Sequence, residues 1–200
     1  MRLFTFQNFT ATLGLTMSLL SINQAAIAQQ IQATPANEES GWWDQTKAKT
    51  LNIVDKGSLS IMLSGYAYHG RHTYTAERIN ELNEKSWGLG FSKVIRNAKD
   101  NEESLFVMAI SDSHFKPQLM AGYTYQWMQT LGGKFEAGLG VTGVLISRTD
   151  YFSGLPFPAP LPMASIGTRS SKIIAAYVPR VSQNKGNGDV LLLLARFELD

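Results

Sequence analysis

The feature that most constrains this chain is an alternation of apolar residues with small or polar ones at every second position. Between residues 134 and 145 the odd positions are mostly apolar, as in Phe135, Leu139 and Leu145, whereas the even positions up to 142 carry Lys, Glu, Gly and Thr. Successive side chains of a β-strand point to opposite faces, so this period of two predicts strands with one apolar face. The same alternation recurs in residues 87–93 and 119–128.

Extended along the chain, this period predicts eight strands joined alternately by short turns and longer loops, with the short loop at residues 113–116 as the exception. Segments of about ten residues are long enough to cross a membrane as tilted strands, and they exceed the five or six residues typical of a sandwich. We therefore predict an all-β protein, an eight-stranded antiparallel transmembrane β-barrel with an N-terminal amphipathic helix. The predicted strands cover residues 59–69, 86–96, 104–112, 117–129, 134–147, 162–169, 172–179 and 189–198.

Composition narrows the class of protein further. The chain has 200 residues, of which 44% are hydrophobic and 17% charged, so it can fold around a core, and disorder is excluded. A formal net charge of +2 is too small for a nucleic-acid footprint, so no nucleic-acid partner is expected. Because there is no Cys, disulfides and thiolate metal sites are excluded. Composition alone leaves a soluble, lipocalin-like carrier as an alternative.

The N-terminal region predicts export followed by a helix. Residues 1–28 are typical of a signal peptide, with a short apolar stretch and Ala26-Ile27-Ala28 before the expected cleavage point. Residues 29–41 are expected to form an exposed leader. Residues 42–56 predict an amphipathic helix, whose paired tryptophans and nearby lysines suit either a membrane interface or a docked position. The barrel is assigned to residues 57–200.

The predicted lumen is partly apolar. The run Val190–Leu194 is apolar on both faces of its strand, and Met120, Gly122 and Thr124 share the other face of a strand whose aromatic residues point outward. A barrel of eight strands has room for side chains or for one small ligand. Two interpretations follow: a pocket for a hydrocarbon chain, or a filled core.

Polar residues gather at the ends of the first and third strands. His69 ends the first, and Asp112 and Ser113 end the third, so the up-and-down order brings them to one rim. An imidazole, a carboxylate and a hydroxyl are the groups used for general-base activation of a hydroxyl, although polar residues at a barrel mouth also occur as plain solvated loops. His69 shares the parity of outward-facing Leu59, so either a bulge or the start of the loop must precede it if it points inward.

Prolines mark a weak point in the predicted wall. With a turn centred between Ser170 and Ser171, Pro162 and Pro179 would lie opposite each other across two strands. Neither residue has an N–H, so the wall would lack ladder hydrogen bonds there. Either the wall opens laterally to the membrane or the strands end early at a loop.

Eight short motifs occur in order along the predicted strands. They are Tyr68-His69 with Tyr74, Trp87–Phe91 (WGLGF), Met108–Ser113 (MAISDS), Ala121-Gly122-Tyr123, Gly138-Leu139-Gly140, Leu161–Gly167 (LPMASIG), Tyr177-Val178-Pro179 and Arg196-Phe197. Each motif is weak alone, but together they show that residues 42–197 resemble the PagP-type lipid A palmitoyltransferases.

The resemblance implies an outer-membrane enzyme of a Gram-negative bacterium. Such an enzyme moves a palmitoyl chain from the sn-1 position of a phospholipid to a hydroxyl of a hydroxyacyl chain on lipid A. Its catalytic residues would be His69, Asp112 and Ser113, with the acyl chain in the lumen and access beside Pro162 and Pro179. From their position at the same face, Arg71 and Arg148 are expected to contact lipid phosphates. We expect a monomer without cofactor or metal; the alternative is a non-catalytic structural or adhesion barrel.

The chain departs from the family pattern at three places. A second wall gap is flanked in the family by prolines at the positions of Ser64 and Ser86, which puts that gap in question. Thr124 replaces the glycine expected at the floor of the acyl pocket, so a preference for chains shorter than palmitate, or a less strict one, is predicted. The last aromatic residue, Phe197, is not the terminal residue.

Overall fold

The computed structural model describes residues 41–149, 152–180 and 188–199; the predicted signal peptide and nearly all of the predicted leader lie outside them. Two compact units divide between Gln45 and Thr46, and the barrel belongs to the second. In the first unit, the described residues include Trp42 and Trp43, whose stacked rings have their centroids 3.9 Å apart.

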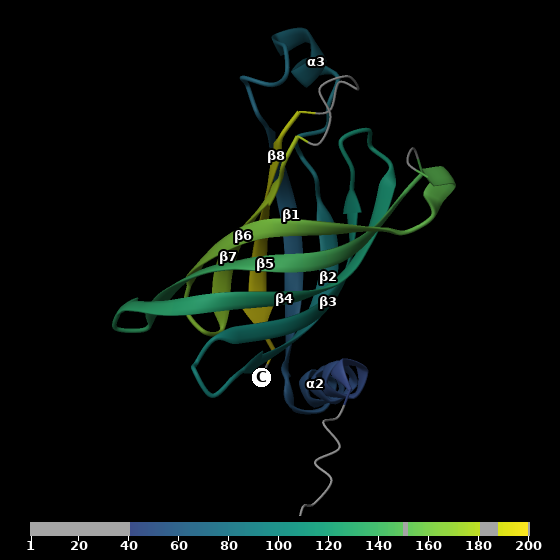
Figure 1. Ribbon diagram of the computed structural model, residues 1–200. Coiled ribbons are helices and arrows are strands. Elements are labelled where there is room, and N and C mark those ends of the chain that lie inside the picture. The colour runs from purple at the N-terminus through teal and green to yellow at the C-terminus, as the bar shows by residue number, and fades with distance from the viewer. Residues whose placement is uncertain (1–40, 150–151, 181–187, 200) are drawn as a thin grey trace, which may run out of the picture. The chain divides into compact units, whose positions relative to one another are not determined.

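The helices and strands follow one another along the chain as Figure 1 shows. They are α2 (Trp42–Lys56), β1 (Ser58–His69), α3 (Ala76–Asn80), β2 (Gly88–Arg96), β3 (Glu102–Ser111), β4 (Pro117–Gly132), β5 (Phe135–Arg148), η1 (Phe152–Gly154), β6 (Phe157–Gly167), β7 (Ser171–Val178) and β8 (Val190–Glu198).

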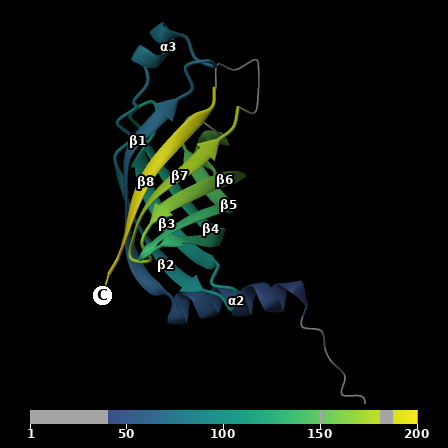
Figure 2. The ribbon, with the colours of Figure 1, turned by 90° about the vertical axis from the view of Figure 1, so that its left-hand side faces the viewer.

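The strands form a closed antiparallel barrel in sequence order, which confirms the predicted fold. Each strand pairs with the next, and β8 pairs with β1, as Figure 2 shows for β7, β8 and β1. Closure leaves no free sheet edge along most of the wall, which is the condition for a β-structure in hydrocarbon. None of the helices in the described ranges is long and apolar enough to cross a membrane.

The two ends of the barrel differ. The strands β1, β3, β5 and β7 finish at one end, called here the α3 end. The connections at this end are long, and one contains α3, except for residues 112–116 between β3 and β4. The opposite end, called the short-turn end, has brief connections such as residues 133–134 and 168–170. This matches the predicted alternation of turns and loops.

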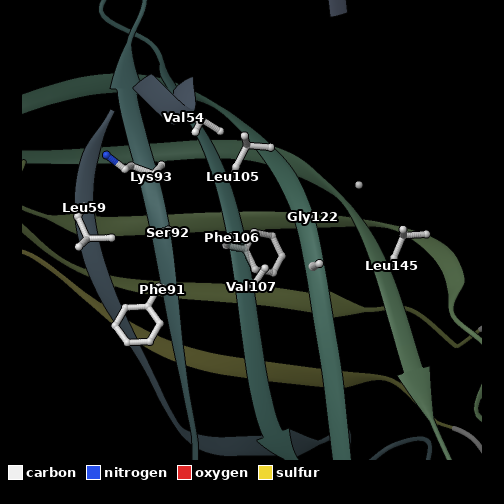
Figure 3. Close-up of a pocket in the computed structure, with 12 residues that line it drawn as sticks. Val54, Leu59, Phe91, Ser92, Lys93, Leu105, Phe106, Val107, Gly122 and Leu145 are labelled. Carbon is white, nitrogen blue, oxygen red and sulfur yellow. The ribbon is translucent and has the colours of Figure 1, made fainter. Parts of the chain in front are cut away.

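The outer face of the barrel is apolar. Large apolar side chains on it remain exposed to a degree unusual for a water-soluble protein, as expected for a surface that contacts lipid. Where this face carries Ala121 and Gly143, it is hollowed into an open pocket of about 540 Å³, lined by Leu59, Phe91, Leu105, Val107 and Leu145 (Figure 3). The exposed residues include Trp87, Leu89, Val107, Leu119, Trp127, Leu139, Val141 and Leu145.

The lumen has an apolar part and a charged part. Leu192 and Leu194 are buried, as predicted, in a cluster with Met62, Met108 and Met120, against which Val190 packs. Toward the short-turn end, β3, β7 and β8 contribute Glu102, Lys172 and Arg196, all nearly inaccessible to solvent. Salt bridges join Glu102 to Lys172, Arg196 and Arg96, and Glu136 to Lys172 and Arg96. This cluster was not predicted from the sequence.

Most strand ends lie within two residues of the prediction, and two ends differ by more. β4 continues to Gly132, and β6 begins at Phe157 instead of residue 162. Pro158 and Pro160 therefore lie within β6, which pairs with β5 along its whole length. In an antiparallel ladder, only every second residue of a strand donates its N–H to a given neighbour. Prolines at alternate positions therefore remove donors from one edge of the strand alone, and they are tolerated where that edge has no partner.

The predicted pairing of Pro162 with Pro179 is wrong by two residues. The β6–β7 register joins Gly167 to Lys172 and ends at Met163 with Ala176. Continuing this register would place Tyr177 opposite Pro162, and Pro179 lies just beyond the end of β7. The turn is centred one residue earlier than assumed. A shift of one residue in the centre of a turn moves the partner of each strand residue by two, so the partner of Pro162 changes from Pro179 to Tyr177.

Candidate active site

His69 is buried at the α3 end because β1 contains a bulge. The β1–β8 register shifts between Ser64 and Tyr66, where Gly65 is the extra residue. This shift reverses the parity of the strand, which is one of the two predicted ways for His69 to point inward, and the His69 side chain is 0% exposed. Its Nε2 atom lies 2.9 Å from the Ser113 hydroxyl oxygen, so two of the predicted site residues are within hydrogen-bond distance.

Asp112 organises the turn that presents Ser113. Its Oδ1 atom accepts hydrogen bonds from the backbone N–H groups of His114 and Lys116, each at 2.8 Å. Phe115 in this turn has a φ of 61°, a conformation that is uncommon for a bulky residue. The two hydrogen bonds to one carboxylate oxygen hold the backbone in that conformation. The other oxygen, Oδ2, lies 3.5 Å from Arg148.

The carboxylate beside the other nitrogen of His69 belongs to Glu84, in the connection between β1 and β2. Its Oε1 atom lies 3.4 Å from Nδ1 and accepts a hydrogen bond from the His69 backbone N–H at 3.1 Å. Asp112 was predicted from the sequence to lie beside His69, and Glu84 was not predicted. The signal for Glu84 was its acidic side chain, three residues before Trp87 in a stretch without periodicity.

Arg71 holds the Glu84 carboxylate with two hydrogen bonds, at 2.7 and 2.8 Å. These bonds keep the pKa of Glu84 at about 2, below its usual range, so the carboxylate is ionised at neutral pH. Arg71 and Arg148, the two predicted phosphate-binding residues, therefore both face carboxylates here. Arg71 also donates to the His69 carbonyl at 2.9 Å, which ties the loop to the end of β1.

Asn83 links the two connections that form the site. Its backbone N–H donates to the Ser113 carbonyl at 2.9 Å, and its side chain donates to the Ser111 hydroxyl and the Asp112 carbonyl. Because Asn83 is itself buried, these bonds fix Glu84 and Ser113 relative to one another. Across the described ranges, no group of three acidic or histidine side chains converges as a metal site would require.

The lumen beyond the site holds a narrow cavity of about 40 Å³. Met120 and Thr124 line it, as predicted from their parity, and both are buried. Gly122 faces Phe106, whose ring occupies the space where a larger side chain at 122 would lie. The remaining lining changes from methionines and leucines to Ser, Thr and Gln with increasing depth; it includes Met62, Met108, Met163, Leu192, Leu194, Ser104, Gln126 and Thr142.

The barrel wall is interrupted beside the apolar lumen. From Phe157 to Pro162, β6 has no partner on the β7 side, because that ladder stops at Met163. The prolines on this edge have no N–H, so fewer donors are left unsatisfied than in an ordinary strand edge. Pro162 lies within β6, directly beyond the last β6–β7 pair, whereas Pro179 follows the end of β7.

A second interruption, between β1 and β2, is bridged by hydrogen bonds. The ladder ends at Ser64 with Gly88. The Ser64 hydroxyl donates to the Ser86 carbonyl, and the Ser86 hydroxyl donates to the Ser111 carbonyl, both at 2.5 Å. The N–H of Ala67 then donates to the Glu84 carbonyl at 2.8 Å. The two serines thus supply wall contacts that prolines could not make.

Comparisons with known proteins agree on one family. The family model described as "Antimicrobial peptide resistance and lipid A acylation protein PagP" matches residues 49–196. A protein of Bordetella pertussis (strain Tohama I), named lipid A acyltransferase PagP, is 35% identical over 161 residues, covering 79% of this chain and 87% of its own. Proteins with the same name from Legionella pneumophila (strain Philadelphia 1) and Methylobacillus flagellatus are 33% and 30% identical over 92% and 89% of this chain, and 98% and 95% of their own.

Proposed function

This chain belongs to the PagP family, and on that premise we propose that it is a lipid A acyltransferase that takes a palmitoyl or similar chain from the sn-1 position of a phospholipid. A closed barrel with an apolar outer face and this family membership indicate a bacterial outer-membrane protein. We place it in a Gram-negative bacterium, as a monomer that needs no cofactor, with the lipid A acceptor at its outer side. The observation that carries the catalytic assignment is the 2.9 Å contact between His69 Nε2 and Ser113 Oγ.

Acyl transfer at this site needs a base and a hydroxyl. Nε2 of His69 accepts a proton as the oxygen of a hydroxyl attacks the ester carbonyl of the phospholipid. The tetrahedral intermediate then collapses, the proton passes to the departing oxygen, and a lysophospholipid leaves. Ser113 is either the nucleophile that first accepts the acyl chain or a hydrogen-bond donor to the reacting oxygens; its contact with His69 suits both roles. Asp112 positions Ser113 through the turn.

The acyl chain of the donor is placed in the lumen. The existing cavity of about 40 Å³ is narrow, so side chains must move aside for a long chain. Methionine is suited to this, because its unbranched thioether adopts several rotamers at low cost. Met62, Met108 and Met120 all lie in the apolar cluster below the site. Access from the membrane is proposed at the unpaired β6 edge beginning at Pro162, with the hydrogen-bonded wall at Ser64 and Ser86 closed.

The activity is tested with the purified full chain in vesicles that contain a lipid A acceptor and a phospholipid labelled in one chain. Label at sn-1 is expected to appear in lipid A together with an unlabelled lysophospholipid, and label at sn-2 is expected to stay in the lysophospholipid. Transfer from sn-2 would contradict the proposed donor position. Absence of transfer from both substrates would contradict the enzyme and favour a structural barrel.

Thr124 is expected to limit the length of the transferred chain. Replacing it by glycine deepens the cavity beyond Gly122, so the Thr124→Gly variant should accept a longer chain. A pocket discriminates between chains that differ by one methylene by about 10- to 200-fold, and we expect a change of preference at the lower end of this range. The measurement is mass spectrometry of lipid A after incubation with phospholipids of mixed chain length.

The matched control is Thr130→Gly, which makes the same change at an exposed position of the same strand. It should leave the chain-length distribution unchanged. If Thr124→Gly gives the same distribution as the unmodified protein, the floor of the pocket is formed elsewhere.

A further inference from the structure

We propose that Glu84 is a positioning residue for acyl transfer, whose carboxylate orients the His69 ring so that Nε2 faces Ser113. The inference rests on the proposed function and adds a residue to it. Glu84 approaches His69 at two points, the backbone N–H and Nδ1, on the side of the ring away from Ser113. A carboxylate on one imidazole nitrogen and a hydroxyl on the other is an arrangement that selects a single tautomer.

The tautomer follows from the acceptors around the ring. Glu84 is ionised and can only accept, so it favours a proton on Nδ1. Nε2 then carries the free lone pair that a base needs, directed at the Ser113 hydroxyl. His69 is fully buried, and Nδ1 makes no hydrogen bond within the described part of the chain. The Glu84 Oε1 atom lies 3.4 Å from Nδ1, and a small movement on substrate binding would close this distance to a hydrogen bond.

The Glu84 carboxylate is itself fixed on several sides. Arg71 binds both of its oxygens, and the Tyr66 hydroxyl donates to Oε2 at 3.3 Å. The Arg71 guanidinium also lies 4.8 Å from the centre of the Tyr68 ring, a cation–π contact. Because Arg71 donates to the His69 carbonyl as well, it connects the carboxylate and the strand end as one unit.

Asp112 is not available for the same task. One of its oxygens accepts the two backbone hydrogen bonds of the Ser113 turn, and the other faces Arg148. The two carboxylates near the site therefore have different roles. Asp112 orients the Ser113 hydroxyl, and Glu84 orients the His69 base.

The kinetic test compares Glu84→Gln with Glu81→Gln. Glu81 lies in the same connection, is exposed, and pairs only with Arg78 among the described residues. We expect Glu84→Gln to lower kcat by a factor between about tenfold and the 10⁴-fold seen when a triad carboxylate is neutralised, with KM nearly unchanged. Glu81→Gln should leave both constants unchanged. Glu84→Asp, which keeps the charge, should recover part of the lost kcat.

The tautomer is measured without any reaction. The chain has three histidines, so a His72→Gln/His114→Gln variant leaves His69 as the single imidazole. Its ¹⁵N spectrum should report a proton on Nδ1, and adding Glu84→Gln should make the Nε2-protonated form appear. An unchanged tautomer, or an unchanged kcat, would overturn the proposal. If the unmodified protein transfers no acyl chain at all, the proposed function fails, while the ¹⁵N spectra still decide how Glu84 acts on His69.

Discussion

Replacing His69 with alanine is expected to slow acyl transfer by about 10²- to 10⁴-fold, the usual contribution of a general base. The ring is buried and directed at Ser113 from 2.9 Å, so no other imidazole can replace it without a rearrangement of β1. Ser113→Ala should cause a loss of similar size, because it removes the group with which the base interacts. The measurement is the rate of label transfer from phospholipid to lipid A under saturating donor.

A variant that lacks both side chains shows whether His69 and Ser113 act together in catalysis or contribute separately to the rate. Residues that act as one unit show losses that do not add, so His69→Ala/Ser113→Ala should be about as slow as the slower single variant. His72→Ala is the control, since His72 is exposed in the neighbouring loop. Heat-modifiable gel migration checks that each variant still forms a barrel. Full activity in both single variants would refute the catalytic assignment.

Much of the barrel could be predicted because membrane strands obey a simple pattern. Lipid-facing and lumen-facing residues alternate, so Leu139 and Val141 identify one face without any knowledge of the neighbouring strands. The parity of His69 conflicted with an inward position, and the sequence offered two ways to remove the conflict, a bulge or an early start of the loop. The structure resolves it at Gly65.

The register of a strand pair is not fixed by parity alone. The error in pairing Pro162 with Pro179 arose because the turn was centred one residue too late. The prolines before residue 162 were assigned to a loop, which is why the predicted β6 began too late. Prolines at alternate positions are compatible with a strand that is paired on one edge, as in β6. The proposed opening survives this correction, because it depends on where the β6–β7 ladder stops.

Glu84 illustrates a limit of a different kind. It lies in an irregular connection, and its place beside His69 depends on hydrogen bonds of Arg71 and Asn83 that have no periodic signature. The charged cluster in the lumen, in contrast, left a signal that was not used. Lys172 and Arg196 occur at lumen-facing positions, where a charge requires a buried partner.

Neutralising Glu102 is expected to have the largest effect on stability. Glu102 lies among three cations: Lys172 at 2.8 Å, Arg96 at 3.2 Å, and Arg196, which contacts both of its oxygens. Removing one partner of a buried ion pair costs about 3–5 kcal/mol, because the remaining charges stay buried without compensation. We therefore expect Glu102→Gln to lower the free energy of unfolding by about this amount, measured by urea titration in lipid vesicles.

Arg196→Gln should cost less than Glu102→Gln, although both break the same contact. The cluster contains three cations and two carboxylates, the second being Glu136. Loss of Glu102 leaves three cations facing one carboxylate, whereas loss of Arg196 leaves two of each. Electrostatic repulsion within a buried site grows with the excess charge, so the order of the two variants reports on the net charge of the cluster.

The double variant Glu102→Gln/Arg196→Gln leaves two cations and one carboxylate in the cluster. Its net charge is therefore the same as in the unmodified chain, but two fewer ions are buried. Because the desolvation of each ion is itself unfavourable, the double variant should be more stable than Glu102→Gln alone. Additive losses would mean that the two residues act independently, contrary to their direct contact. A Glu102→Gln variant as stable as the unmodified chain would mean that water reaches this part of the lumen and compensates the charges, which their near-complete burial argues against.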